Sequence, residues 1–371
     1  MSSSSLSSAN TILNHCHFSH LPKTTPSTTI TKTPTPPSLS SFPTLFSSKS
    51  AVKLNFQIQS MSSTAINNPS SESEWNYSDS DVAQKFLFFN VLKDGRIHVF
   101  SPPLNLVPPS FGASFGVEIK DVEISSSISA RLILPSSRAT NLPVLLYIHG
   151  GGFCMNSAFS DEYTRFCSQI AVESNAVVLS VEYGLFPTRP LPACYDDSWT
   201  ALQWLASHST GSGPDPLINH HADLNRIFVG GDSAGGNISH TVLSKVGSIG
   251  LHGNAAIEGM ILIHPYFGED DKMWMYMCPS NVGPQDPRMK PAVEDLARIG
   301  CGRVLVLLAE KDVLYGAGKM YADELSKSGW NGELEIMESK DKEHCFHLGN
   351  HTDLEAGVIR KRIASFINRQ S

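Results

Sequence analysis

Between two regular elements lies the stretch Ile227-Phe228-Val229-Gly230-Gly231-Asp232-Ser233-Ala234-Gly235. It begins as an apolar run of strand length, and a helical pattern follows from Ala234 to Val246. The residues from Gly231 to Gly235 read G-x-S-x-G, and their small side chains permit a tight strand-to-helix turn that exposes the serine hydroxyl. The first helical N–H groups then point at any anion that forms there. We therefore predict that Ser233 is a nucleophile at the end of a buried strand.

Apolar runs and helical patterns alternate along the rest of the chain. Near-continuous apolar runs indicate strands that are buried on both faces, which is typical of a mostly parallel sheet. Helical patterns lie between Tyr163 and Ile170 and between Leu354 and Ile367, and a third begins at Asp196-Asp197. The alternation predicts a doubly wound α/β fold with helices on both faces and the site at the carboxyl ends of the strands. The apolar runs are residues 144–148, 176–181, 260–263, 304–308 and 334–337; antiparallel strands at 97–100 and 117–134 are expected to lead in.

A second glycine-rich motif, His149-Gly150-Gly151-Gly152-Phe153, directly follows the run 144–148. Three glycines allow the backbone to approach a substrate carbonyl and to aim N–H groups at it. Ester hydrolysis needs such donors, because its tetrahedral intermediate concentrates negative charge on one oxygen. A phosphate-binding loop is the alternative, but no G-x-x-x-x-G-K-[ST] pattern follows. The two motifs together favour acyl chemistry, with Gly150, Gly151 and Gly152 as candidate oxyanion-hole residues and His149 as support.

A serine hydroxyl needs a base at neutral pH, and the acid and base are expected after the serine in the order acid, then histidine. Asp312 follows the run 304–308 closely, and Glu310 is the alternative carboxylate. The last run, 334–337, is followed by a loop that contains His344 and His347. Chemistry alone leaves both histidines open as the base.

The composition of the chain argues against several classes of protein. The chain has 371 residues, of which 41% are apolar, and a formal charge of −7, which does not favour binding to nucleic acid or an anionic membrane. No apolar run is long enough for a transmembrane helix. The seven cysteines are scattered without a C-x-x-C pair, which favours reduced thiols. His220 and His221 are adjacent and no H-E-x-x-H occurs, so neither a metal nor another cofactor is expected.

Residues 1–70 differ from the rest. They contain 28 serines and threonines, and the first acidic residue of the chain is Glu72. Such a segment is predicted to be disordered, and it is typical of a plastid transit peptide. An untargeted tail of a cytoplasmic protein, or translation from Met61, are the alternatives. The remainder, 71–371, is predicted to be one catalytic domain with a small N-terminal or cap region.

The chain from about Asp81 to Ile367 resembles the plant carboxylesterases, in the hormone-sensitive-lipase-like branch of the α/β-hydrolases. The matching stretches are HGGGF, GDSAGGN, LPACYDD, RVLVLLAEKD, SGW and EHCFHL. The resemblance implies the α/β-hydrolase fold and a triad of Ser233, Asp312 and His344, with His347 in support. It also implies that the backbone N–H groups of Gly151, Gly152 and Ala234 form the oxyanion hole.

Two departures from the family pattern concern the pocket. The family usually reads Y-R-L-A-P-E-H-P where this chain has residues 183–190, so a charged network is expected to be missing. Only residues 268–272 separate Phe267 from Met273, where the family carries a longer insertion. That insertion helps to build the cap, so its loss predicts a more open site; an incomplete gene model is the alternative.

Three functions fit these patterns to different degrees. The first is hydrolysis of short-acyl esters of small plant metabolites through an acyl-serine. The second is a dehydratase or lyase on the same scaffold; some of those relatives carry threonine at the nucleophile position, and Ser233 favours hydrolysis. The third is a hormone receptor, which resembles the family without the catalytic histidine, whereas His344 is present here. The expected partner is a small-molecule ester.

Overall fold

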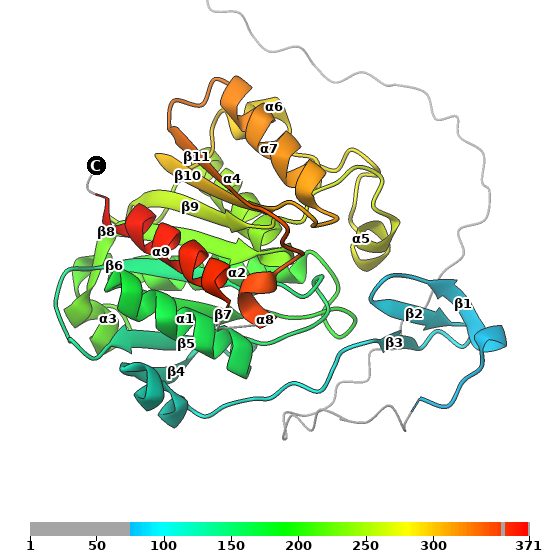
Figure 1. Ribbon diagram of the computed structural model, residues 1–371, viewed down its shortest axis with the longest axis horizontal. Coiled ribbons are helices and arrows are strands. Elements are labelled where there is room, and N and C mark those ends of the chain that lie inside the picture. The colour runs from blue at the N-terminus through cyan, green and yellow to red at the C-terminus, as the bar shows by residue number, and fades with distance from the viewer. Residues whose placement is uncertain (1–74, 350–352, 370–371) are drawn as a thin grey trace, which may run out of the picture. The chain divides into compact units, whose positions relative to one another are not determined.

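The computed structural model describes residues 75–349 and 353–369. The predicted leader, residues 1–70, therefore lies outside the described residues. The apolar runs form an eight-stranded sheet in the order β11-β10-β9-β8-β6-β7-β5-β4, and helices cover it (Figure 1). Its strands are β4 (Val117–Ser125), β5 (Ile128–Pro135), β6 (Leu142–Ile148), β7 (Val177–Glu182), β8 (Ala222–Asp232), β9 (Ile257–Ile263), β10 (Arg303–Ala309) and β11 (Glu333–Ser339).

The sheet is parallel from β11 to β7, and β5 and β4 extend it in antiparallel pairing. All seven residues of β6 and all seven of β10 are buried, which is why β6 and the residues of β10 after Arg303 are apolar without alternation. The expectation of a mostly parallel α/β sheet is confirmed. The chain leaves β8, β10 and β11 at the same edge, where their following loops can meet.

Helices bury their apolar stripes on the two faces of this sheet. One face packs against α1 (Asp161–Ser174) and α9 (Leu354–Asn368), which lie side by side in Figure 1. The other face packs against α2 (Ala193–Ala206), α4 (Ala234–Ile249) and α7 (Tyr315–Lys327). Helix α2 begins three residues before the predicted start at Asp196-Asp197, and Asp196 lies in its first turn instead. An acidic residue is favourable there because the turn carries free N–H groups.

The first described strands do not join the main sheet. β1 (Val82–Lys85), β2 (Phe89–Leu92) and β3 (Ile97–Val99) form a separate antiparallel sheet of three strands. The sequence predicted an antiparallel strand at residues 97–100, and β3 does pair with β2 in antiparallel direction. The shorter elements of the described chain are η2 (Asp79–Asp81), η3 (Pro109–Phe115), η4 (Ser207–Thr210), α3 (Pro216–His221), α5 (Lys272–Met277), α6 (Val293–Leu296) and α8 (Phe346–Gly349).

Candidate active site

Ser233 lies on a sharp turn between β8 and α4. Its backbone has φ +51° and ψ −118°, and its N–H donates to the carbonyl of Ile263 at 2.8 Å. A Cβ on Gly231 would lie 2.1 Å from the carbonyl oxygen of Ile148, and one on Gly235 only 1.9 Å from the same atom. Glycine is therefore required on both sides, since β6 passes too close for any side chain. The turn holds a serine in an unfavourable backbone conformation, a strain found mainly at functional sites.

Ser233, His344 and Asp312 form one chain of hydrogen bonds. The Nε2 atom of His344 lies 2.9 Å from Ser233 Oγ, and its Nδ1 lies 2.8 Å from Asp312 Oδ2. Three separate loops, those after β8, β10 and β11, supply the three residues. The Asp312 side chain is almost fully buried, whereas about a third of the His344 side chain is exposed. This arrangement permits a proton to pass from the serine to a histidine that a carboxylate orients.

Burial opposes ionisation of Asp312, but hydrogen bonds from His344 and from the N–H of Leu314 outweigh it. The pKa of this carboxyl therefore lies below its ordinary value. The alternative carboxylate, Glu310, instead accepts from the N–H of Asp341 at 2.9 Å. Asp341 in turn pairs with Lys311 at the surface. The structure thus brings Asp312 to the histidine and leaves Glu310 in a surface loop.

The two histidines of the last loop have different surroundings. His347 is buried, and its ring lies edge-on to that of Phe166, with the centroids 4.9 Å apart. Neither of its ring nitrogens has a hydrogen-bond partner among the residues that the structure describes, and burial lowers the pKa of His347 to about 3. Only His344 reaches Ser233. The structure therefore separates two residues that the sequence chemistry left equivalent.

The glycine loop after β6 has two glycines in the left-handed region, with φ +110° at Gly151 and +58° at Gly152. Within the described part of the chain, neither of their N–H groups makes a hydrogen bond, so both are free to donate. Ala234 begins α4, so its N–H has no acceptor in a preceding turn. Gly150 differs, because its N–H already donates to the Tyr163 hydroxyl (3.0 Å) and to Asp232 Oδ1 (3.2 Å). The expectation that Gly150 is an oxyanion donor is therefore wrong, since its only N–H is occupied.

His149 is fully buried behind this loop. Its ring stacks on Tyr183 with the centroids 4.3 Å apart, and its Nδ1 donates to the carbonyl of Gly150 at 2.8 Å. The Tyr183 hydroxyl donates to the carbonyl of His149 at 2.8 Å. Burial lowers the pKa of His149 to about 4, which keeps the ring neutral. Through Gly150 and Tyr183, His149 thus supports the glycine loop.

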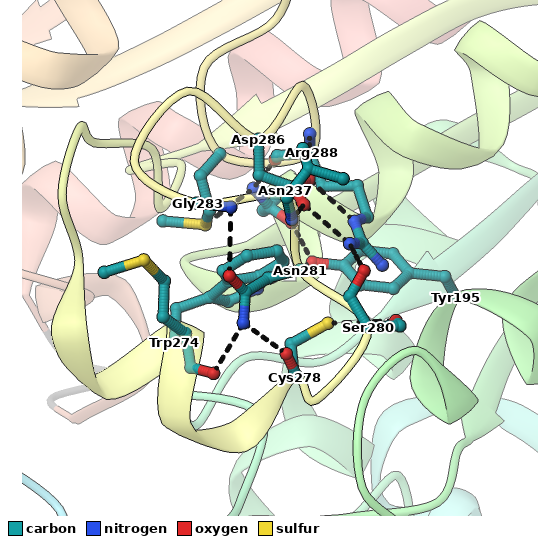
Figure 2. A network of polar contacts seen from close by, with 12 residues as sticks. Tyr195, Asn237, Trp274, Cys278, Ser280, Asn281, Gly283, Asp286 and Arg288 are labelled. Atoms are coloured by element: carbon teal, nitrogen blue, oxygen red, sulfur yellow. Dashed lines mark hydrogen bonds and ion pairs between the residues drawn. The ribbon is translucent and has the colours of Figure 1, made fainter. Parts of the chain in front are cut away.

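The segment between β9 and β10 is attached to helix α4 by a buried polar network (Figure 2). Asn237, one turn after Ser233, donates from Nδ2 to the carbonyl of Arg288 at 2.6 Å and accepts from the Tyr195 hydroxyl at 2.8 Å. The indole of Trp274 on α5 donates to that hydroxyl at 3.0 Å, and the Arg288 guanidinium lies 5.0 Å above its ring. The short segment is therefore fixed against the helix that begins at Ser233.

The small N-terminal sheet reaches the glycine loop. A Cβ on Gly152 would lie 2.4 Å from the ring of Phe88, so this ring lies directly against the loop. Phe86 contacts Tyr276 of α5, with ring centroids 5.2 Å apart. Beside this contact lies an open hollow of about 500 Å³, lined by Gln84, Lys85, Phe86, Lys272, Met275 and Tyr276. Two segments that are far apart in sequence thus meet beside the site.

The loop of residues 183–190 retains a charged pair despite its departure from the family pattern. Arg189 binds the buried Asp197 at 2.8 Å, and Asp197 also accepts from the N–H of Gly184. Arg189, two residues before the LPACYDD stretch, therefore supplies a cation to this loop, whereas the arginine and glutamate of the family pattern are absent, as the sequence indicated. Asp197 lies on α2, which also carries Tyr195 of the network in Figure 2.

Two groups in the described residues have metal-ligand chemistry: His264, Cys345 and His347, and His264, Asp312 and His344. Both share His264, whose Nδ1 accepts the N–H of Cys345 at 3.0 Å. The second group is already joined by the bond between His344 and Asp312. An ion at either group would displace these bonds, so the arrangement fits a hydrogen-bonded site better. No helix among the described residues is long and apolar enough to span a membrane.

Comparison with known proteins agrees with this geometry. Residues 145–348 match the family model described as the alpha/beta hydrolase fold. "Probable carboxylesterase 7" of Arabidopsis thaliana is 38% identical, over 76% of this chain and 96% of that protein. A 2-hydroxyisoflavanone dehydratase of Glycine max is 35% identical, over 77% and 98%. An esterase from the archaeon Pyrobaculum calidifontis superposes with a TM-score of 0.56 and 26% identity, over 67% and 85%.

These matches show that the chain belongs to the α/β-hydrolase family. Within that family it belongs to the plant carboxylesterases of the hormone-sensitive-lipase-like branch, and it is a serine carboxylic-ester hydrolase by class.

Proposed function

We propose that this protein hydrolyses short-acyl carboxylic esters of small plant metabolites through a covalent acyl-serine. Ser233 is the nucleophile, His344 the general base and Asp312 the carboxylate that orients it. The observation that supports this most strongly is the continuous pair of hydrogen bonds, 2.9 Å from Ser233 Oγ to His344 and 2.8 Å from His344 to Asp312. Such a set acts as one unit in acyl transfer.

In the first half-reaction, His344 Nε2 takes the hydroxyl proton while Ser233 Oγ attacks the ester carbonyl carbon. The ionised Asp312 stabilises the imidazolium that forms. The carbonyl oxygen becomes an oxyanion and accepts hydrogen bonds from the N–H groups of Gly151, Gly152 and Ala234. His344 then returns the proton to the departing alkoxide oxygen, the C–O bond breaks, and the acyl group stays on Ser233.

In the second half-reaction, a water molecule replaces the alcohol. His344 takes one of its protons, and the hydroxide oxygen attacks the acyl carbon through a second oxyanion in the same backbone cradle. The bond to Ser233 Oγ breaks, the proton returns to that oxygen, and the carboxylic acid leaves. One water is consumed, and the serine is restored.

The test is Ser233→Ala, with esters of graded acyl length as substrates. We expect loss of hydrolysis by several powers of ten with an unchanged fold, because the nucleophile is removed. Ser248→Ala, an exposed serine on the same helix, is the matched control and is expected to be fully active. A serine-directed organophosphate should add its mass to the wild type and not to Ser233→Ala. Near-normal turnover without Ser233 would overturn the assignment.

Elimination on the same scaffold is the second candidate, because two relatives at 35–36% identity are named 2-hydroxyisoflavanone dehydratase. In that reaction His344 would remove a proton from carbon, and no acyl-serine would form. Product analysis separates the two: hydrolysis releases an alcohol and an acid in equal amounts, whereas elimination yields an unsaturated product. Retention of Ser233 favours hydrolysis.

We also propose that residues 1–70 direct the protein to plastids, on the basis of their hydroxyl-rich and acid-free composition. Its partner there is the small-molecule ester, with no nucleic acid or membrane involved. A fluorescent protein carrying residues 1–70 is expected to enter plastids, and a diffuse cytosolic signal would contradict this.

A further inference from the structure

Asp232, the last residue of β8, is a buried carboxylate that the proposed reaction does not use. Its exposed fraction is only 1%. Hydrogen-bond donors hold its oxygens, and within residues 75–349 and 353–369 no lysine or arginine forms an ion pair with it. Tyr147 donates its hydroxyl to Oδ1 at 2.7 Å, and Tyr163 donates its hydroxyl to Oδ2 at 2.9 Å. A buried ion costs folding free energy, so its presence calls for an explanation beyond packing.

Two further donors come from the loops that carry the reactive groups. The N–H of Gly150 donates to Oδ1 at 3.2 Å, and the thiol of Cys345 donates to Oδ2 at 3.5 Å. Gly150 directly precedes the free N–H groups of the glycine loop, and Cys345 directly follows His344. Ser233 directly follows Asp232 itself. Asp232 is thus the sequence neighbour of the nucleophile. Its two loop donors are the sequence neighbours of the base and of the first oxyanion donor.

We infer that Asp232 is a positioning residue that fixes the glycine loop and the His344 loop relative to Ser233. This inference rests on the proposed function for its effect on turnover, although the geometry it describes does not. The contact is tight as well as polar, since a Cβ on Gly150 would lie 2.4 Å from Asp232 Oδ2. The Tyr163 hydroxyl strengthens the arrangement, because it accepts from Gly150 N–H while it donates to the carboxylate.

A shared acceptor is needed because the reacting groups lie on loops that follow different strands, so the chain itself does not fix the distances between them. A carboxylate accepts several hydrogen bonds at once, so it can hold donors from β6, α1 and two loops at fixed distances. The pKa of Asp232 lies above its ordinary value, because burial outweighs the hydrogen bonds from Tyr147, Tyr163 and Cys345 that lower it. Each donor therefore favours the ionised form, which is the form that accepts all four bonds. A displacement of about 1 Å at the reacting atoms costs about a hundredfold in rate.

Asp232→Asn tests this inference with almost no change in volume. The amide retains only one accepting oxygen, and its NH₂ group faces donors. We expect kcat to fall by about one to two powers of ten with KM changed less than about threefold, because substrate contacts remain while the reacting groups shift. The rate of organophosphate modification of Ser233 should fall in parallel. Asp215→Asn, which alters a buried carboxylate at the start of α3, is the matched control and should lower stability without lowering kcat.

A readout without substrate separates this inference from the proposed function. The proton on His344 Nδ1, shared with Asp312, gives a low-field proton NMR resonance that depends on the position of the ring. Asp232→Asn is expected to shift or broaden it, whereas Asp215→Asn should leave it in place. If wild-type hydrolysis proves independent of Ser233, the proposed function fails, and this resonance still decides the positioning role.

Tyr163→Phe keeps the experiment decisive if Asp232→Asn does not fold. This substitution removes the hydroxyl that donates to Asp232 and accepts from the N–H of Gly150. We again expect a fall in kcat that is larger than the change in KM. The effects of Tyr163→Phe and Asp232→Asn should be less than additive in the double variant, since both act through one network. A folded Asp232→Asn or Tyr163→Phe enzyme with wild-type kcat and an unchanged resonance would overturn the inference. So would a loss of kcat that disappears when the temperature is lowered to restore the folded fraction.

Discussion

His344 and His347 lie three residues apart, yet they have opposite surroundings. His344 is partly exposed and hydrogen-bonded to Ser233 and Asp312, whereas His347 is buried against Phe166 and its ring has no hydrogen-bond partner in the described part of the chain. The difference arises because α8 begins at Phe346 and turns the second ring into the core. Two identical side chains therefore make different contacts, because the backbone points one ring toward Ser233 and the other into the core.

We therefore expect His344→Ala to lose ester hydrolysis by several powers of ten, because Ser233 then has no base. His347→Ala should retain measurable kcat with lower stability, because it leaves a cavity beside Phe166. Steady-state kinetics on a short-acyl ester, with thermal unfolding as the control for folding, distinguishes the two. The reverse ranking of activities would exchange their roles.

Two parts of the chain that are distant in sequence lie beside the candidate site. The sheet of β1, β2 and β3 places Phe88 against Gly152, and the segment around α5 is held by the network in Figure 2. Phe86 and Tyr276 join these two segments. The sequence predicted an open site from the short segment after Phe267, and the N-terminal sheet contributes a wall beside the glycine loop.

A small lid offers little apolar surface to a long acyl chain, and burial is worth about 25 cal/mol per Å². We expect kcat/KM to fall from acetyl or butyryl to octanoyl esters. Phe88→Ala should increase the difference between butyryl and octanoyl esters, because it removes apolar surface beside the glycine loop. Leu87→Ala, whose side chain is 72% exposed, is the neighbouring control and should keep the wild-type ranking. A preference that rises steadily with acyl length in the wild type would contradict the open-site prediction.

At the scale of the whole molecule, several buried imidazoles make folding sensitive to acid. Burial lowers the pKa of His149 to about 4 and that of His240 and His347 to about 3. The pKa of His264 also lies well below its ordinary value, through burial and then through His347 and His344. In an unfolded chain these rings take up protons near pH 6.5, so the unfolded state binds more protons than the folded state below that pH.

The stability of the fold is therefore expected to fall as pH decreases from 6.5 toward 4. At pH 5 each such ring contributes a loss of up to about 2 kcal/mol relative to neutral pH. His240→Gln, outside the proposed active site, should make the free energy of unfolding less dependent on pH between 7.5 and 5. His252→Gln, at an exposed histidine, should leave the dependence as it is. Urea denaturation of the three proteins at both pH values measures this, and equal slopes for all three would contradict it.

The sequence by itself determined the parallel sheet, the turn at Ser233 and the order of the candidate triad. These features follow from local rules, since apolar runs specify buried strands and G-x-S-x-G specifies a turn that only small residues fit. Asp312 could be named because it closely follows a buried strand. The same rules could not rank His344 above His347, since both share one loop and one chemistry.

Only the tertiary structure decided which backbone N–H groups are free and which segments surround the site. Gly150 looks like its neighbours in the sequence, but Asp232 and Tyr163 occupy its N–H. The hydrogen bonds from Tyr147 and Tyr163 to Asp232 span 85 and 69 residues, so no local spacing signals them. Their formation depends on β6, α1 and β8 packing together, which is a property of the folded chain and not of any segment of it.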